Sequence, residues 1–175
     1  HPFLMRTHSS SATTSVFRSP VAGPLTTVVT EHVVQGSIVF PGAGYLEMGH
    51  AAGAAVHGTR SVTLQGVFFL YAMVLDGLSP GVQLECTVAE ASLSIQSVGF
   101  DDDEEGRTLC RGDVLPGGKF APMPKPTANQ PSDPEALYAA FHKVGLQYGP
   151  VFRPLRKMWS AEDRSEARAI MYPRR

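Results

Sequence analysis

The chain has 175 residues and a mass of 18.8 kDa, which is enough for one domain with a core of its own. Its formal net charge is −1 and its basic residues are scattered, which argues against a nucleic-acid surface. No apolar run reaches the roughly 20 residues that span a bilayer, so we expect no membrane segment. Two cysteines, Cys86 and Cys110, in a chain without a secretory leader predict reduced thiols and a cytoplasmic location.

The N-terminal residues predict a loop at the start of a fragment. The chain opens on His1-Pro2 rather than on an initiator Met and stops soon after a strand-like segment. We therefore expect a piece of a longer polypeptide. Residues 1–19 are rich in Ser and Thr, which predicts a loop leading into a first strand near residues 15–18.

A helix is predicted over residues 42–57, because Tyr45, Met48, Ala52 and Val56 recur at helical spacing. The segment is also rich in Gly and Ala, and each interior Gly costs roughly 1 kcal/mol of helix propensity relative to Ala. Close approach of a wrapped sheet would offset that cost. The pattern therefore favours an α+β hotdog fold, in which a curved antiparallel sheet encloses a central helix.

Further strands are predicted after this helix, at residues 62–75, 82–88, 92–97 and 107–115. The acidic run at residues 101–105 imitates the start of a calcium loop, but Gly112 stands where such a loop needs a bidentate Glu. We expect a solvated hairpin turn at this run instead.

A proline-rich linker is predicted at residues 116–134. A helix should follow to about residue 144, with Asp133 as its cap, Pro134 at its first position and Gly145 as its stop. Two last strands are expected at residues 155–159 and 166–171. The predicted layout is a first domain at residues 1–115, the linker at 116–134, and a helix followed by two strands at 135–175.

His32 and Gly42 are the leading candidates for chemistry. A histidine that acts as a base near neutral pH must be unprotonated, and apolar neighbours such as Val33 and Val34 disfavour the imidazolium. Gly42 opens the predicted helix, where an unshielded backbone N–H and the helix dipole favour a negatively charged oxygen. Gly42 can equally be a simple helix entry.

Other catalytic classes fit poorly. Glu47 and His50 form one Glu-x-x-His, but carboxylate-bridged metal sites need two copies and further carboxylates. Ser9 to Ser11 have no Gly-x-Ser-x-Gly context, and neither cysteine lies in a nucleophile motif. We therefore expect neither a bound metal nor a serine or cysteine nucleophile.

Several motifs resemble one enzyme family. His32, Gly36 and Pro41 form the pattern HxxxGxxxxP, which runs into PGAGYLEM. This stretch resembles the N-terminal half of the dehydratase domains of modular polyketide synthases and animal-type fatty acid synthases. The opening His1-Pro2 is similar to the HP of that family. The later GLQYGPVF resembles the family's GYxYGPxF motif, with Leu146 in place of its Tyr and with matches at Gly145, Tyr148, Gly149, Pro150 and Phe152.

The resemblance implies a layout, a mechanism and partners. Residues 1–115 would be the N-terminal hotdog of a double hotdog, and residues 135–175 would be a connecting helix with the start of a second, truncated hotdog. The residue matching His32 would remove the α-proton of a 3-hydroxyacyl thioester, while the backbone N–H of Gly42 would hold the carbonyl oxygen. Pro41 and Tyr148 would lie near the substrate channel. The substrate would arrive on the phosphopantetheine of an acyl carrier protein, so the resemblance implies no bound metal, nucleotide or other cofactor. The remainder of the parent synthase is the other implied partner, and the alternative that we expect is a homodimer that imitates the double hotdog.

The family's second catalytic residue is the point of departure. It is an aspartate in a DxxxQ or DxxxH motif of the second hotdog, and no Asp after Phe152 lies in such a motif. We therefore expect the isolated chain to be impaired as a hydro-lyase. Two alternatives stay open: a product-template-like cyclase or isomerase on the same double hotdog, and a non-catalytic structural half-domain.

Overall fold

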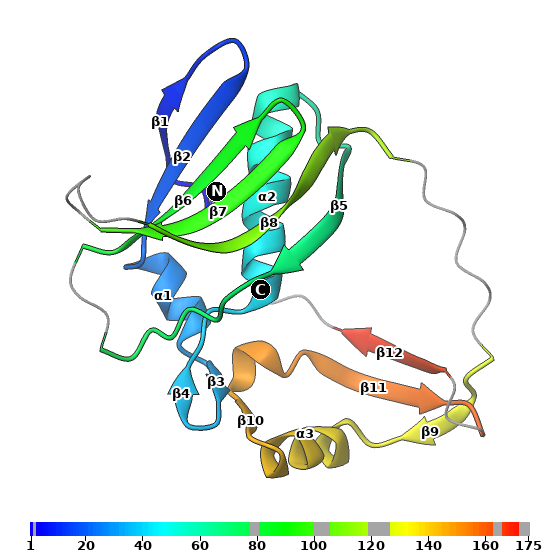
Figure 1. Cartoon of the computed structure of the whole chain (residues 1–175). Helices are drawn as coiled ribbons and strands as arrows, with labels where there is room; N and C mark the ends of the chain where they lie inside the picture. Colours follow the sequence, from blue (N-terminus) through cyan, green and yellow to red (C-terminus); the bar gives the residue numbers. More distant parts are fainter. Residues whose placement is uncertain (2, 78–80, 100–105, 119–126, 163–165, 172–175) are drawn as a thin grey trace. The chain divides into compact units, whose positions relative to one another are not determined.

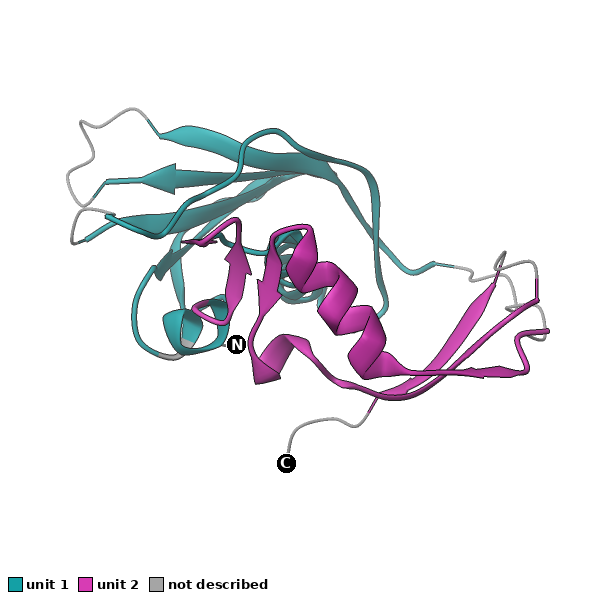
Figure 2. Cartoon of the chain, turned by 90° about the horizontal axis from the view of Figure 1, so that it is seen from below, with its two compact units in different colours: residues 1–29, 39–119 teal, residues 30–38, 120–175 magenta. Residues whose placement is uncertain are grey.

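The computed structural model describes residues 1, 3–77, 81–99, 106–118, 127–162 and 166–171. The chain forms two compact units, which Figure 2 distinguishes by colour. Unit 1 comprises residues 1–29 and 39–119, and unit 2 comprises residues 30–38 and 120–175. Each unit is described by itself. His32 therefore belongs to unit 2, as does the GLQYGPVF segment.

Unit 1 is built on a six-stranded antiparallel sheet in the order β1-β2-β6-β7-β8-β5. Its strands are β1 (Arg6–Ser10), β2 (Thr14–Pro20), β5 (Val62–Phe69), β6 (Gln83–Ala89), β7 (Ser92–Val98) and β8 (Arg107–Pro116). In β6 and β7 the residues with buried side chains alternate with more exposed ones at Thr87, Ser94 and Gln96, as expected of strands with one face on a core. The unit also contains the short helix α1 (Pro24–Val29).

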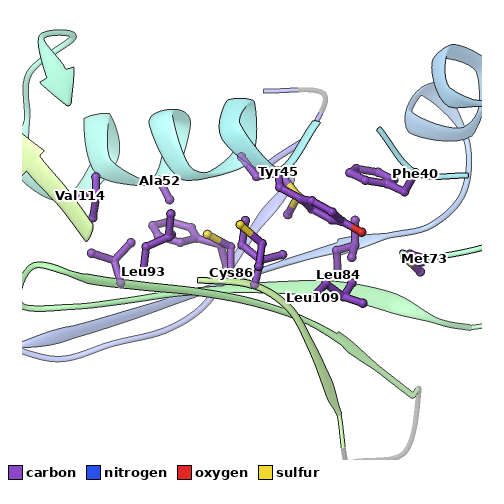
Figure 3. Close-up of a cluster of buried hydrophobic side chains, with 14 of the residues drawn as sticks. Phe40, Tyr45, Ala52, Met73, Leu84, Cys86, Leu93, Leu109 and Val114 are labelled. Carbon is purple, nitrogen blue, oxygen red and sulfur yellow. The ribbon is translucent and has the colours of Figure 1, made fainter. Parts of the chain in front are cut away.

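Helix α2 (Gly42–His57) packs along this sheet against β5, β6, β7 and β8 (Figure 1). Figure 3 shows the helix above a layer of sheet side chains that includes Leu84, Cys86, Leu93 and Val114. The glycines of α2 permit this contact. A Cβ on Gly49 would lie 2.6 Å from Cδ2 of Leu93, and one on Gly53 would lie 2.8 Å from Cγ1 of Val62. The predicted helix bounds and the predicted reason for its small residues agree with the structure.

The two cysteines are free and buried. In the sheet register Cys86 is opposite Ile95, and Ile95 is opposite Cys110. The two cysteines therefore lie two strands apart, or about 9.6 Å at the usual strand spacing. A disulfide needs Cα atoms closer than about 7 Å, so this pair cannot form one without a rearrangement.

Unit 2 contains helix α3 (Pro134–Lys143), the 3₁₀ turn η1 (Pro150–Phe152) and two small sheets. One sheet has the order β10-β3-β4, and the other has the order β12-β11-β9. The strands are β3 (His32–Val34), β4 (Ser37–Ile38), β9 (Gln130–Ser132), β10 (Leu146–Tyr148), β11 (Leu155–Ser160) and β12 (Ala167–Met171). The predicted start of α3 is confirmed, because the Asp133 side chain accepts a hydrogen bond of 2.9 Å from the Glu135 N–H and Pro134 occupies the first position.

Several sequence predictions are corrected. The Ser/Thr-rich start is not all loop, because β1 pairs with β2 across it. The strand predicted over residues 62–75 ends at Phe69, after a bulge between Gln65 and Phe68 where Gly66 has a φ of 56°. The linker predicted at residues 116–134 contains β9, which pairs with β11.

Three further predictions concern the acidic turn, the middle of the linker and the absence of a membrane segment. The acidic run at residues 101–105 lies outside the described residues, as does the middle of the predicted linker. Among the described residues, no helix is both long enough and apolar enough to cross a membrane.

Candidate active site

His32 lies at the start of a tight β-hairpin. Strands β3 and β4 pair with Val34 opposite Ser37, which leaves a two-residue turn of Gln35 and Gly36. Both turn residues have positive φ, 50° at Gln35 and 83° at Gly36. Two consecutive positive φ angles define the type I′ turn that suits the twist of a hairpin. The glycine of the HxxxG pattern is therefore a requirement of the backbone that carries His32.

The GLQYGPVF segment pairs with this hairpin. Strand β10 runs antiparallel to β3, with Tyr148 opposite His32 and Leu146 opposite Val34. Beyond the ladder, the Gln35 N–H donates to the Gly145 carbonyl oxygen at 2.6 Å. The Gly36 N–H donates to Oε1 of Gln147 at 2.8 Å. Both motifs predicted from the sequence thus form one structural element.

The imidazole of His32 lies against two aromatic rings. Its centroid is 5.1 Å from that of Tyr148, with an interplanar angle of 25°, and 5.0 Å from that of Phe152, with an angle of 56°. The Tyr148 and Phe152 rings are themselves 5.9 Å apart. The half-buried imidazole of His32 therefore contacts two aromatic rings of the GLQYGPVF segment.

Two glycines of the second motif are needed for close approach. Gly145 has a φ of 90°, and a Cβ there would lie 2.9 Å from Cγ of Gln35. A Cβ on Gly149 would lie 2.8 Å from both Cβ and Cγ of Glu31. Pro150 then opens η1 at a position where its fixed φ suits a helical turn. These residues shape the backbone that leads to Phe152.

Tyr148 also lines a cavity of about 380 Å³ between α3 and β10. Its other lining residues are Glu135, Tyr138, Ala139, His142, Leu146 and Arg153. A larger hollow of about 530 Å³ lies beside His57 and the β1–β2 hairpin in unit 1, and none of the predicted site residues lines it.

Pro41 and Gly42 belong to unit 1 and are described there. Pro41 is buried and precedes α2 in an extended conformation, with φ −71° and ψ 139°. Gly42 is the first residue of α2, where backbone N–H groups have no acceptor within the helix. A Cβ on Gly42 would lie 3.3 Å from the Phe69 ring. The structure therefore brings together His32, Tyr148 and Phe152, and it places Gly42 at a helix start.

Sequence reasoning missed Glu31, Gln35 and Gln147, which hold the two motifs together. Glu31 accepts the Gly149 N–H at its carbonyl oxygen, at 2.9 Å, and the Val151 N–H at its carboxylate. These polar residues sit inside or beside the recognised motifs. No periodicity or spacing marks them, because their partners are more than 100 positions away in the chain.

The half-motif Glu47 and His50 is not assembled as a metal site. Oε1 of Glu47 lies 2.9 Å from Nε2 of His1. Within the described part of the chain, no group of three or more His, Cys, Asp and Glu side chains is arranged to hold a metal ion.

Comparison with known proteins places the chain in a family. A family model described as polyketide synthase dehydratase domain matches residues 1–98, and one described as polyketide synthase dehydratase N-terminal domain matches residues 119–174. The chain belongs to the polyketide synthase dehydratase domain family. The predicted resemblance is thereby confirmed.

Curated relatives of this dehydratase domain are polyketide synthases. It is 26% identical over 174 residues to squalestatin tetraketide synthase of Phoma sp., which covers 82% of this chain and 7% of that protein. It is 29% identical over 157 residues to polyketide synthase ThaG of Burkholderia thailandensis, which covers 80% of this chain and 3% of that protein. The domain thus corresponds to a small part of each relative.

Solved dehydratase domains share the fold. The dehydratase from the CurF module of curacin polyketide synthase matches with a TM-score of 0.73 and 18% identity, over 91% of this chain and 62% of that chain. GphF dehydratase 1 matches with a TM-score of 0.75 and 22% identity, over 93% of this chain and 60% of that chain. These likenesses confirm the predicted α+β hotdog fold. The chain spans about 60% of the solved domains.

Proposed function

We propose that this chain is the histidine-bearing part of a dehydratase that eliminates water from a 3-hydroxyacyl thioester carried by an acyl carrier protein. The observation that carries the proposal is the pairing of β3 with β10, which sets His32 against Tyr148 and Phe152. Membership of the dehydratase family gives the reaction class.

In the proposed reaction His32 acts as the general base. One imidazole nitrogen takes the proton from the α-carbon of the thioester, and the electron pair of that C–H bond becomes the new α,β double bond. The C–O bond at the β-carbon then breaks, and the hydroxyl takes a proton from a general acid and leaves as water. The rings of Tyr148 and Phe152 fix the imidazole and leave it few orientations, which is the positioning that such a transfer needs.

Gly42 and Pro41 are proposed to form the part of the site that binds the thioester carbonyl oxygen. Charge develops on that oxygen as the α-proton leaves, and a free backbone N–H at the positive end of a helix stabilises such charge. Gly42 supplies an N–H of this kind, and the absence of a side chain keeps it accessible. Pro41 fixes the chain direction into the helix.

The general acid is proposed to lie in the part of the solved dehydratase domains that this chain does not span. The chain contains no Asp-x-x-x-Gln or Asp-x-x-x-His sequence. Asp133 accepts the Glu135 N–H as the cap of α3, and Asp163 lies outside the described residues. Two variants of the CurK dehydratase are inactive, one with a histidine replaced by phenylalanine and one with an aspartate replaced by asparagine. These two inactive variants support a mechanism in which one histidine and one aspartate each carry out part of the reaction.

The substrate carrier and the cofactor requirement follow from the same proposal. The acyl group would arrive on the phosphopantetheine arm of an acyl carrier protein, and the elimination needs neither a metal nor a nucleotide. The cavity beside Tyr148, with its two tyrosine rings, is a suitable place for part of that arm.

The test is dehydration of a 3-hydroxyacyl thioester, presented on carrier protein and as a short pantetheine thioester, with enoyl product measured by mass spectrometry. The parent synthase should be active, and His32→Ala should lower its rate by about 10²- to 10⁴-fold, the usual contribution of a general base. The 175-residue chain alone should show a similar deficit because it lacks the acid.

His50→Ala is the matched control, because His50 is exposed on α2 and takes no part in the proposed site. It should retain the parental rate. A parent that is folded but inert toward every thioester offered would refute the proposal and favour a structural role.

A further inference from the structure

Glu31 contacts the second motif through its backbone, its aliphatic carbons and its carboxylate. The Gly149 N–H donates to the Glu31 carbonyl oxygen at 2.9 Å. The Val151 N–H donates to Oε2. The position of a Cβ on Gly149 is only 2.8 Å from Cβ and Cγ of Glu31, so this side chain lies directly on the Gly149 backbone.

The Glu31 carboxylate binds the first backbone N–H of η1, that of Val151. In η1, Pro150 has no N–H, so Val151 is the next residue whose N–H can anchor the start of the turn. A hydrogen bond from a backbone N–H to a carboxylate is roughly twice as strong as a neutral one. The same turn carries Phe152, which lies against His32.

The other contacts hold neighbouring segments. The β3–β10 ladder and the Gly36 to Gln147 bond fix residues 146–148. After Gly149 the chain is also tied to α3, because the Leu155 N–H donates to the Tyr138 hydroxyl at 3.1 Å and Arg153 pairs with Glu135. If the carboxylate bond were lost, the Gly149 N–H would still be bound to the Glu31 carbonyl oxygen and the chain after the turn to α3, but the Val151 N–H would lose its bond to Glu31.

We propose that Glu31 is a positioning residue of this site, whose carboxylate holds the turn that places Phe152, beside Tyr148, on the His32 imidazole. Its effect on catalysis rests on the proposed function, whereas its effect on the geometry of His32 does not. Glu31 itself acts through the two rings and is given no contact with substrate.

The test separates the hydrogen bond from packing. Glu31→Met removes the acceptor and keeps a long side chain against Gly149, whereas Glu31→Gln keeps an acceptor oxygen. In the 175-residue chain with isotopically labelled histidine, the ring protons of His32, assigned with His32→Ala, should lose their ring-current shift in Glu31→Met. They should recover most of it in Glu31→Gln.

In the parent synthase, Glu31→Met should lower kcat by about 10- to 100-fold with a smaller change in KM, the effect expected of a misplaced catalytic group. Glu162→Met is the matched control, because Glu162 is an exposed glutamate of unit 2. It should leave both the shift and kcat unchanged.

Each remaining outcome decides the proposal. An unchanged His32 shift in Glu31→Met would overturn it. Unfolding of unit 2 in that variant, seen in the fluorescence of Trp159, would show a purely structural role and overturn it as well. Failure of Glu31→Gln to recover the shift would refute the acceptor role. An inert wild-type parent would instead refute the proposed dehydration, and the shift would still decide the role of Glu31.

Discussion

Position 36 of the His32 hairpin favours glycine because of its backbone conformation, and not because neighbouring atoms leave no room for a side chain. Its φ of 83° follows a φ of 50° at Gln35, and a Cβ at residue 36 would meet nothing within 4 Å. An L-residue pays a conformational penalty in this region, and Asn pays less than most because its side chain tolerates it. Conformation alone therefore explains why a glycine follows the histidine at this spacing.

Gly36→Ala should lower the free energy of unfolding of unit 2 by about 1–2 kcal/mol, the cost of a left-handed conformation for an L-residue. Gly36→Asn should cost less. Urea unfolding followed by Trp159 fluorescence measures both, since the single Trp lies in β11 of unit 2. Equal stabilities of the Ala variant and the wild type would contradict the assigned turn.

The residues of the site differ in how far the sequence reveals them. His32 and Tyr148 can be predicted because each lies in a motif with fixed spacing. The sequence cannot reveal that these two residues face each other, because that depends on the register between β3 and β10. Glu31 is beyond sequence reasoning for the same reason. The donor to its carboxylate is 120 positions away, and a lone acidic residue beside a motif carries no pattern.

Helix α2 shows packing overriding helix propensity. Gly44, Gly49 and Gly53 are buried, and at each of them a Cβ would come within 3 Å of a side chain. Around Gly53 those neighbours are Val62 and Val114, whose branched side chains have few alternative rotamers. The sheet can approach the helix because glycine occupies positions 49 and 53, whereas Gly44 makes room for the ring of Phe40.

Gly53→Ala should therefore destabilise unit 1, although alanine is the better helix former. Overpacking of a core costs typically 1–3 kcal/mol, against a propensity gain of roughly 1 kcal/mol. We expect a net loss of about 1 kcal/mol. Ala55→Gly, at an exposed position of the same helix, should lose a similar amount through propensity alone. Urea denaturation followed by circular dichroism measures both variants, and a stabilised Gly53→Ala would mean that the sheet yields.

Elements with strong internal patterns could be predicted, and elements defined by pairing could not. The bounds of α2 and the cap of α3 follow from local residues. Strand β1 has no buried residue, so it carries no alternation and exists only through its pairing with β2. Strand β9 is three residues long and contains Pro131, so only its partner β11 identifies it.

The two units of the molecule differ in their response to alkaline pH, because both cysteines lie in unit 1. Burial, reinforced by the nearby Cys110 and Glu85 charges, raises the pKa of Cys86 from 9.0 to about 12. Burial raises the pKa of Cys110 from 9.0 to about 11. Between pH 9.0 and the raised pKa of each thiol, the folded state keeps the thiol proton that the unfolded state loses. The folded state therefore binds more protons in this range. The stability of unit 1 should therefore fall as pH rises above about 9.

The loss should reach about 2 kcal/mol for each thiol at pH 10.5, since each pKa unit corresponds to about 1.4 kcal/mol. Comparing urea unfolding at pH 8 and pH 10.5 for the wild type and Cys86→Ala isolates this term, because the cavity left by alanine costs the same at both pH values. The variant should lose about 2 kcal/mol less, and equal pH slopes for the two proteins would refute the assigned thiol burial.

Thiol reactivity reports on the unfolding of unit 1, and Trp159 fluorescence reports on the unfolding of unit 2. If the two units unfold independently, the thiols should become reactive at a lower pH than the fluorescence changes. Simultaneous transitions would show that the two units unfold together.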